Sequence, residues 1–82
     1  MQTFEVTQRL VYKPTFQLEV VRLVVEAETD LLAESAARQY LTETYPKLPE
    51  CDVSVDCNPQ YFRIVFPPTY RTETGRCWKL AN

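Results

Sequence analysis

Residues 16–25 read FQLEVVRLVV, and this stretch decides the fold of the chain. It opens with alternating apolar and polar residues and then becomes a nearly continuous apolar run that only Arg22 interrupts. Alternation with a period of two is the pattern of a β-strand, and a continuous run of β-branched residues is typical of a strand covered on both faces. Residues 16–25 are therefore predicted to form a central strand.

The residues before this stretch predict its partner strand. Residues 4–12 also alternate, with Phe4, Val6, Leu10 and Tyr12 on one face, although Gln8 interrupts that apolar series. The short segment at residues 13–15 contains a proline, which favours a turn. We therefore expect residues 4–25 to form a β-hairpin.

A helix is predicted directly after the hairpin. Thr29 or Asp30 can cap its start, and Pro46 ends it after about Tyr45. Its apolar residues recur at the helical period, so one face can pack on a sheet. These residues are Leu32, Ala33, Ala36, Ala37, Tyr40, Leu41 and Thr44.

Further strands are predicted in the last third of the chain. Residues 51–57 alternate without a fault, Asn58-Pro59 reads as a turn, and residues 61–66 alternate again. A short hairpin is expected from residues 69–72 and 76–80, with Gly75 in a left-handed bulge position. The predicted fold is one α+β domain over residues 1–82: an antiparallel sheet of four or more strands in the order β-β-α-β-β, extended by this hairpin, with one helix on one face.

Composition restricts the class of protein. The chain has 82 residues and a net charge of −2, and its acidic residues concentrate before residue 60. No apolar stretch is long enough to cross a membrane, and the N-terminus lacks the pattern of a signal peptide. We therefore expect a cytoplasmic protein without membrane partners, and nucleic acid is a poor match for this charge.

The chain lacks the residues on which common catalytic sites depend. It has no histidine and one glycine, which leaves no usual general base and no glycine-rich phosphate loop. The spacing of Cys51, Cys57 and Cys77 fits no zinc motif, and an odd count without a signal peptide favours reduced thiols. We expect no enzymatic activity, no catalytic residues, no metal and no cofactor.

Two groups of residues are candidates for binding a partner. Glu28, Asp30 and Glu34 surround the predicted helix start, where they either complement the helix dipole or attract a protein with a basic surface. Tyr70 and Trp78 lie in the predicted C-terminal hairpin, where they either anchor a partner or cover the edge of the core. The sequence leaves both alternatives open.

The central strand suggests self-association. One helix covers only one face of a sheet, whereas residues 20–25 present apolar side chains to both faces. We expect Val21, Leu23 and Val25 to lie on the uncovered face and to contribute to a homodimer or to a docked partner.

By architecture alone, the chain resembles the small phage-encoded inhibitors that include anti-CRISPR proteins. This resemblance implies a non-enzymatic protein that occludes a site on a host macromolecular complex, in the cytoplasm of the host cell. One alternative is a homodimeric structural or accessory protein. The other is a module for single-stranded nucleic acid, with Tyr61 and Arg63 as a stacking platform.

Overall fold

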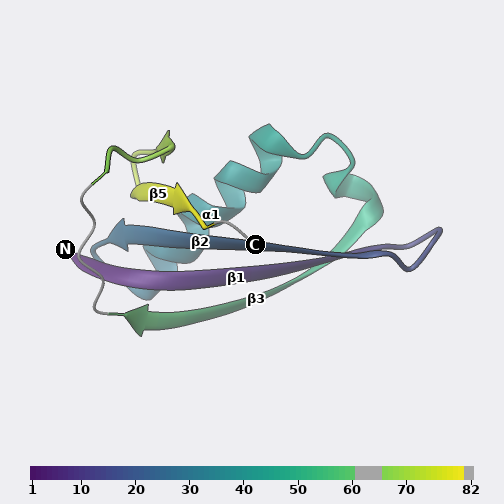
Figure 1. The fold of residues 1–82 in the computed structure, drawn as a ribbon, viewed down its shortest axis with the longest axis horizontal. Helices are drawn as coiled ribbons and strands as arrows, with labels where there is room; N and C mark the ends of the chain where they lie inside the picture. The colour runs from purple at the N-terminus through teal and green to yellow at the C-terminus, as the bar shows by residue number, and fades with distance from the viewer. Residues whose placement is uncertain (61–65, 81–82) are drawn as a thin grey trace.

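The computed structural model describes residues 1–60 and 66–80 and contains a five-stranded antiparallel sheet with one helix packed against it (Figure 1). The strand order is β3-β1-β2-β5-β4. The elements are β1 (Gln2–Tyr12), β2 (Leu18–Ala27), α1 (Asp30–Thr44), the 3-10 turn η1 (Leu48–Glu50), β3 (Cys51–Gln60), β4 (Tyr70–Arg71) and β5 (Arg76–Lys79). This arrangement confirms the predicted α+β fold.

Helix α1 begins and packs as its sequence predicts. The Thr29 hydroxyl accepts a hydrogen bond from the Leu32 backbone N–H at 3.2 Å and so caps the first turn. Small residues dominate the buried face, which lets the helix axis approach the sheet closely. The buried residues of α1 are Ala33, Ala36, Ala37, Tyr40 and Leu41.

The face of β2 that lies under α1 differs from the prediction. Val21, Leu23 and Val25 belong to the core cluster together with the alanines of α1, and none is more than 1% exposed. The prediction that these three residues form the uncovered face is therefore wrong. Arg22 indicates which face of β2 is uncovered, because this charged residue shares that face with Val20 and pairs with Glu5 at 2.9 Å.

Gln8 occupies a core position of β1 between Val21 of β2 and Val55 of β3. Its side chain is fully buried, and neither amide atom has a hydrogen-bond partner in the described part of the chain. The strand parity that buries Val6 and Leu10 also buries this polar residue. A buried, unpaired amide costs stability, so Gln8 is an energetic defect in the core.

Strand β3 is longer than predicted and less buried. Asn58 and Pro59 continue the strand opposite Glu5 and Phe4, so the predicted turn at these residues is wrong. Proline is compatible with this position because β3 is an edge strand and needs no N–H on its outer side. The predicted strand at residues 61–66 lies outside the described residues except for Phe66, which is exposed.

The C-terminal hairpin forms from β4 and β5, as predicted, but Gly75 has a different role. The structure contains no glycine with a positive φ, so the predicted left-handed bulge is wrong. Instead, a Cβ atom at residue 75 would lie 2.8 Å from the Glu26 carbonyl oxygen of β2. Glycine is needed here because the hairpin backbone approaches β2 so closely.

Candidate binding surfaces

One end of the molecule is acidic. Glu28 and Asp30 are exposed at the start of α1. The carboxylates of Glu34, Asp30 and Asp56 lie near enough to the Cys57 thiol to raise its pKa. We call Glu28, Asp30, Glu34 and Asp56 the acidic end. Among the residues that the structure describes, the ion pairs are Lys13–Asp52, Arg22–Glu5 and Arg76–Glu26, so none of these four carboxylates is neutralised by one.

Cys57 lies at the centre of the acidic end. Burial, followed by the negative charges of Glu34 and Asp30, raises the pKa of this thiol to about 11. Its sulfur lies 4.0 Å from the Asp30 carbonyl oxygen, toward which it can donate a weak hydrogen bond. A shallow cavity of about 390 Å³ lies beside it, lined by Gln2, Phe4, Glu28, Thr29, Asp30, Cys57 and Pro59.

The opposite end is the tip of the β1–β2 hairpin, where the sequence analysis identified no binding residue. Phe16 is 80% exposed there and has a φ of 55°, in the left-handed region that residues other than glycine rarely adopt. Its backbone N–H donates to the Tyr12 carbonyl oxygen at 2.6 Å, which fixes the turn. Phe16 was predicted as the first residue of a strand, and that prediction is wrong because β2 begins at Leu18. Its position just after Pro14-Thr15 indicates the turn.

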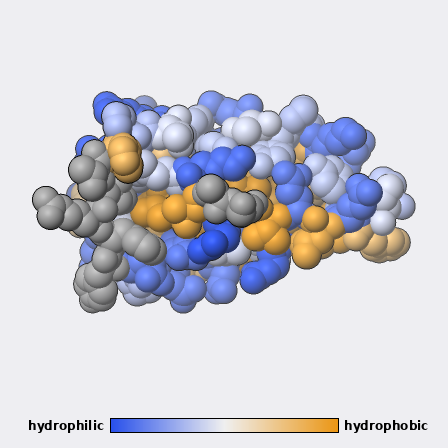
Figure 2. Space-filling model, viewed as in Figure 1, coloured by the Kyte–Doolittle hydropathy of each residue, from blue (hydrophilic) through white to orange (hydrophobic). Residues whose placement is uncertain are grey.

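Apolar residues continue from this tip along the uncovered face of the sheet. Leu18 is 62% exposed, and it lies opposite the partly exposed Val11. Val20 follows Leu18 on the same face. We call Val11, Phe16, Leu18 and Val20 the apolar stripe. Figure 2 shows apolar surface extending across this face to the end of the hairpin.

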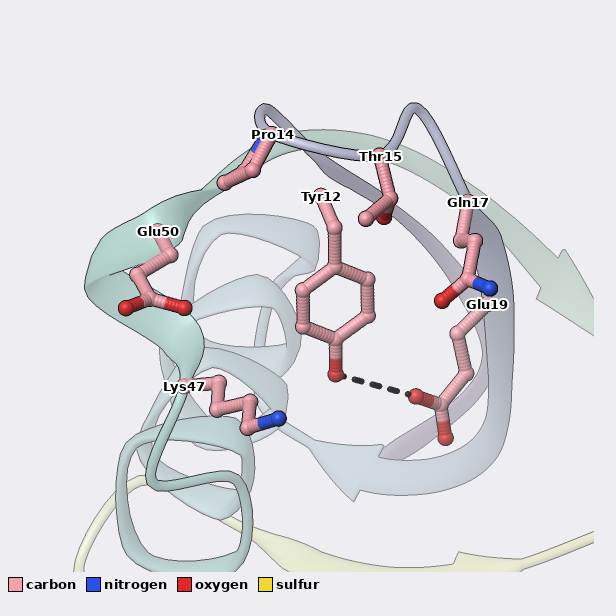
Figure 3. Close-up of a pocket in the computed structure, with 7 residues that line it drawn as sticks. All are labelled: Tyr12, Pro14, Thr15, Gln17, Glu19, Lys47 and Glu50. Atoms are coloured by element: carbon pink, nitrogen blue, oxygen red, sulfur yellow. Dashed lines mark hydrogen bonds between the residues drawn. The ribbon is translucent and has the colours of Figure 1, made fainter.

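A second cavity, of about 450 Å³, lies between the hairpin and η1 (Figure 3). Tyr12 occupies its centre and donates a hydrogen bond from its hydroxyl to Glu19 at 3.4 Å. Lys47 extends toward the same hydroxyl from the opposite wall. The full lining is Tyr12, Pro14, Thr15, Gln17, Glu19, Lys47 and Glu50. The Tyr12 hydroxyl and the Glu19 carboxylate already satisfy each other here, so this cavity is a weaker candidate for a binding site than the exposed tip beside it.

Tyr70 and Trp78 lie on different faces of the C-terminal hairpin. The Tyr70 ring packs edge-on against the buried Tyr40 of α1, with 5.6 Å between ring centroids. Trp78 lies beside Val24 on the other face and donates from its indole N–H to the Phe66 carbonyl oxygen at 2.6 Å. Both side chains are half-buried, and their contacts favour the prediction that they cover the edges of the core.

Several thiols and phenols of the described residues have raised pKa values. Burial raises the pKa of the Cys77 thiol to about 11, and burial together with the Glu19 carboxylate raises the pKa of Tyr45 to about 12. A hydrogen bond to Glu43 raises the pKa of Tyr70 to about 12. Activated nucleophiles need the opposite shift, because the deprotonated form reacts.

Comparison of the chain with protein-family models, with curated proteins and with solved structures found no significant match. No helix in the described residues is both long enough and apolar enough to cross a membrane. Tyr61 and Arg63, the predicted stacking platform for nucleic acid, lie outside the described residues. The function must therefore be argued from the acidic end and the apolar stripe.

Proposed function

We propose that this chain is a non-enzymatic binding protein that occludes a site on a larger protein partner, with the tip of the β1–β2 hairpin as its main contact. The observation that supports this proposal most strongly is the backbone of Phe16. A large apolar side chain is held in an unfavourable left-handed conformation and is almost fully exposed to solvent.

The Phe16 backbone is held by its hydrogen bond to Tyr12, but its exposed side chain gains little packing from the described residues that would offset this conformation. A left-handed backbone costs a non-glycine residue about 1–2 kcal/mol, and glycine would remove most of that cost. An exposed aromatic ring contributes little to folding, whereas aromatic residues dominate the energetics of protein interfaces. The strain is thus more readily explained by contact with a partner than by stability.

The adjoining residues of the apolar stripe provide area for such a contact. Leu18 and Val11 are neighbours across the β1–β2 ladder, so the apolar surface extends from the tip toward the middle of the sheet. Exposed apolar surface of this kind is typical of interaction sites. The architectural resemblance to phage-encoded inhibitors favours occlusion of a host site as the result of binding.

The acidic end is the second contact that we propose, for a basic region of the same partner. Its carboxylates lack ion-pair partners within the described residues, so their field extends into solvent. Charges of this kind mainly increase the rate of association and make it sensitive to salt. Phe16 would then provide affinity, and the acidic end would provide orientation.

The proposal can be tested by photo-crosslinking in extracts of the source cell. A photoreactive phenylalanine at residue 16 should crosslink to one dominant protein, and the same group at Gln39 should not. Gln39 is the control because it is exposed on α1 and lies more than one helical turn beyond Glu34, outside both proposed contacts. Equal crosslinking from both positions, or none from residue 16, would contradict the proposed contact.

Substitutions then separate binding from folding. Phe16→Gly should leave the fold at least as stable and should abolish capture of that protein. Changing Glu28, Asp30 and Glu34 together to lysine should slow association and reduce its salt dependence while the chain stays folded. If the lysine variant associates as fast as the wild type at low salt, the acidic end is not part of the interface.

A further inference from the structure

Among the described residues, β3 pairs only with β1, so its outer edge has backbone groups available for another strand. The Lys13 N–H donates to the Glu50 carbonyl oxygen at 3.1 Å, and hydrogen-bonded pairs alternate along an antiparallel ladder. The even-numbered residues of β3 therefore bond to β1, and the odd-numbered residues from Val53 onward direct their backbone polar groups outward, whereas the Cys51 N–H donates to the Leu48 carbonyl oxygen. Pro59 agrees with this assignment, because its missing N–H belongs on the outer side.

The side chains of β3 are also sorted by face. The odd-numbered residues share the α1 face and are apolar: Cys51, Val53, Val55, Cys57 and Pro59. Val53 and Val55 are 41% and 37% exposed, although they alternate as core residues do. The even-numbered residues share the uncovered face and are polar: Asp52, Ser54, Asp56, Asn58 and Gln60.

A second copy of this chain can pair with this edge only in certain registers. A two-fold axis perpendicular to the sheet keeps odd residues opposite odd residues, so each candidate axis passes through one residue of β3. An axis at Ser54 places Asp52 opposite Asp56 of the second copy, and an axis at Asp56 places that carboxylate opposite itself. Like charges directly opposite one another destabilise a strand pair, which disfavours these two registers. An axis at Val53 pairs only residues 51–55 of the two copies and leaves the second half of β3 without a partner.

An axis at Val55 gives a different result, because every carboxylate of β3 then meets an uncharged hydrogen-bonding group. On the polar face of β3, Asp52 lies opposite Asn58 and Asp56 opposite Ser54 of the second copy. On the apolar face, Val55 lies opposite Val55, and Val53 lies opposite Cys57. This register also pairs nearly the full length of the strand.

We propose that a second copy of this chain docks on β3 as an antiparallel strand with its two-fold axis at Val55. The two sheets join into one, with both α1 helices on the same side. A second copy is the occupant that fits best, since this strand supplies its own amide and hydroxyl partners for its two carboxylates, Asp52 and Asp56. The proposal does not depend on the hairpin contact, because Phe16 lies at the tip beyond β3, and of the acidic end it uses Asp56 alone.

The register can be tested by oxidative crosslinking of a variant in which Cys51 and Cys57 are serine. Adding Val55→Cys should give a disulfide-linked dimer with copper phenanthroline as oxidant, because directly opposed residues lie within the roughly 7 Å limit for a disulfide. Adding Val53→Cys instead should not give a linked dimer. In this register residue 53 of one copy lies opposite residue 57 of the other, so the two cysteines would be separated by four residues of strand, roughly 13 Å. A dimer from Val53→Cys alone, or from neither variant, would overturn the register.

A charge-swap cycle tests the interface without cysteines. Asn58→Asp should weaken dimerisation roughly tenfold in sedimentation equilibrium, because the new carboxylates would face Asp52 at two symmetric places. Adding Asp52→Asn to this variant should restore dimerisation. The double variant retains any repulsion between residue 58 and neighbouring Glu5, so rescue isolates the contact between copies. A monomeric wild type at millimolar concentration, or failure of the rescue, would overturn the proposal.

Discussion

Strands β2 and β3 both direct valines of one parity toward α1, but the two strands have different surroundings. In β2, Val21 and Val25 lie between two neighbouring strands and beneath α1, and both are buried. In β3, Val53 and Val55 have the same alternation and face the same side of the sheet, but more than a third of each side chain is exposed. The difference is position: β2 is central, and β3 is the edge strand.

This comparison shows that alternation reports which residues share a face and not how well that face is covered. Helix α1 has a narrow, alanine-rich buried face, and its cover reaches Leu23 but only part of β3. A strand pattern is therefore a statement about backbone geometry, and burial depends on the neighbours that the fold provides.

The largest expected effect contrasts the two strands directly. Leu23→Ala should lower the free energy of unfolding by about 2–5 kcal/mol, because it removes a fully buried side chain and leaves a cavity. Val53→Ala should lower it by less than about 1 kcal/mol, as is usual for exposed positions. Urea denaturation of the two variants measures both values, and similar losses would refute the contrast.

A substitution at Gly75 tests how closely the C-terminal hairpin packs against β2, on the edge of β2 opposite β1. Gly75→Ala should destabilise the fold by about 1–3 kcal/mol, because the added methyl group would collide with the Glu26 carbonyl oxygen. Thermal unfolding compared with Ala27→Gly, which removes a buried methyl group at the same place, would distinguish crowding from loss of packing. A Gly75→Ala variant as stable as the wild type would show that the hairpin can shift.

Gln8 lies on β1, between β2 and β3, and its replacement should raise the stability of the fold, whereas the two previous substitutions lower it. Gln8→Met should raise the free energy of unfolding by about 1–2 kcal/mol, because it replaces an unpaired buried amide with an apolar chain of similar length. Gln39→Met, on the exposed face of α1, is the control and should have little effect. Destabilisation by Gln8→Met would show that the amide has a partner, such as a bound water.

The smallest effects concern two thiols, Cys77 next to β2 and Cys57 on β3. Cys57 is partly exposed and should react with iodoacetamide before the fully buried Cys77. Both pKa values are raised to about 11, so the folded chain holds these protons more tightly than the unfolded chain. Stability should therefore be retained below about pH 9 and decline between about pH 9 and 11. Urea midpoints across this range, with Cys77→Ala as a less sensitive control, would check this sign.

Much of the fold could be predicted from particular residues. Thr29 and Pro46 bracket α1, and the alternation in residues 4–12 and 51–57 located β1 and most of β3. Short-range patterns of this kind depend on neighbours in the chain, which the sequence shows directly. The face of β2 was wrongly assigned because its run is apolar on both sides, and only Arg22 distinguished them.

The candidate binding surfaces were harder to predict for a physical reason. The acidic end could be anticipated because Glu28, Asp30 and Glu34 are close in sequence. The exposure of Phe16 depends on the turn conformation, and the free edge of β3 depends on strand order. Both are properties of the assembled sheet, and no local pattern contains them.

The placement of β1 between β2 and β3 has a consequence for how the chain folds. The β1–β2 ladder joins residues close in sequence and can form early, whereas the β1–β3 ladder joins Thr3 to Gln60 and closes a long loop. Until β3 arrives, one side of β1 is an unpaired edge above a partly formed core. The nascent chain is thus most prone to aggregation after the hairpin has formed and before β3 is available to close it.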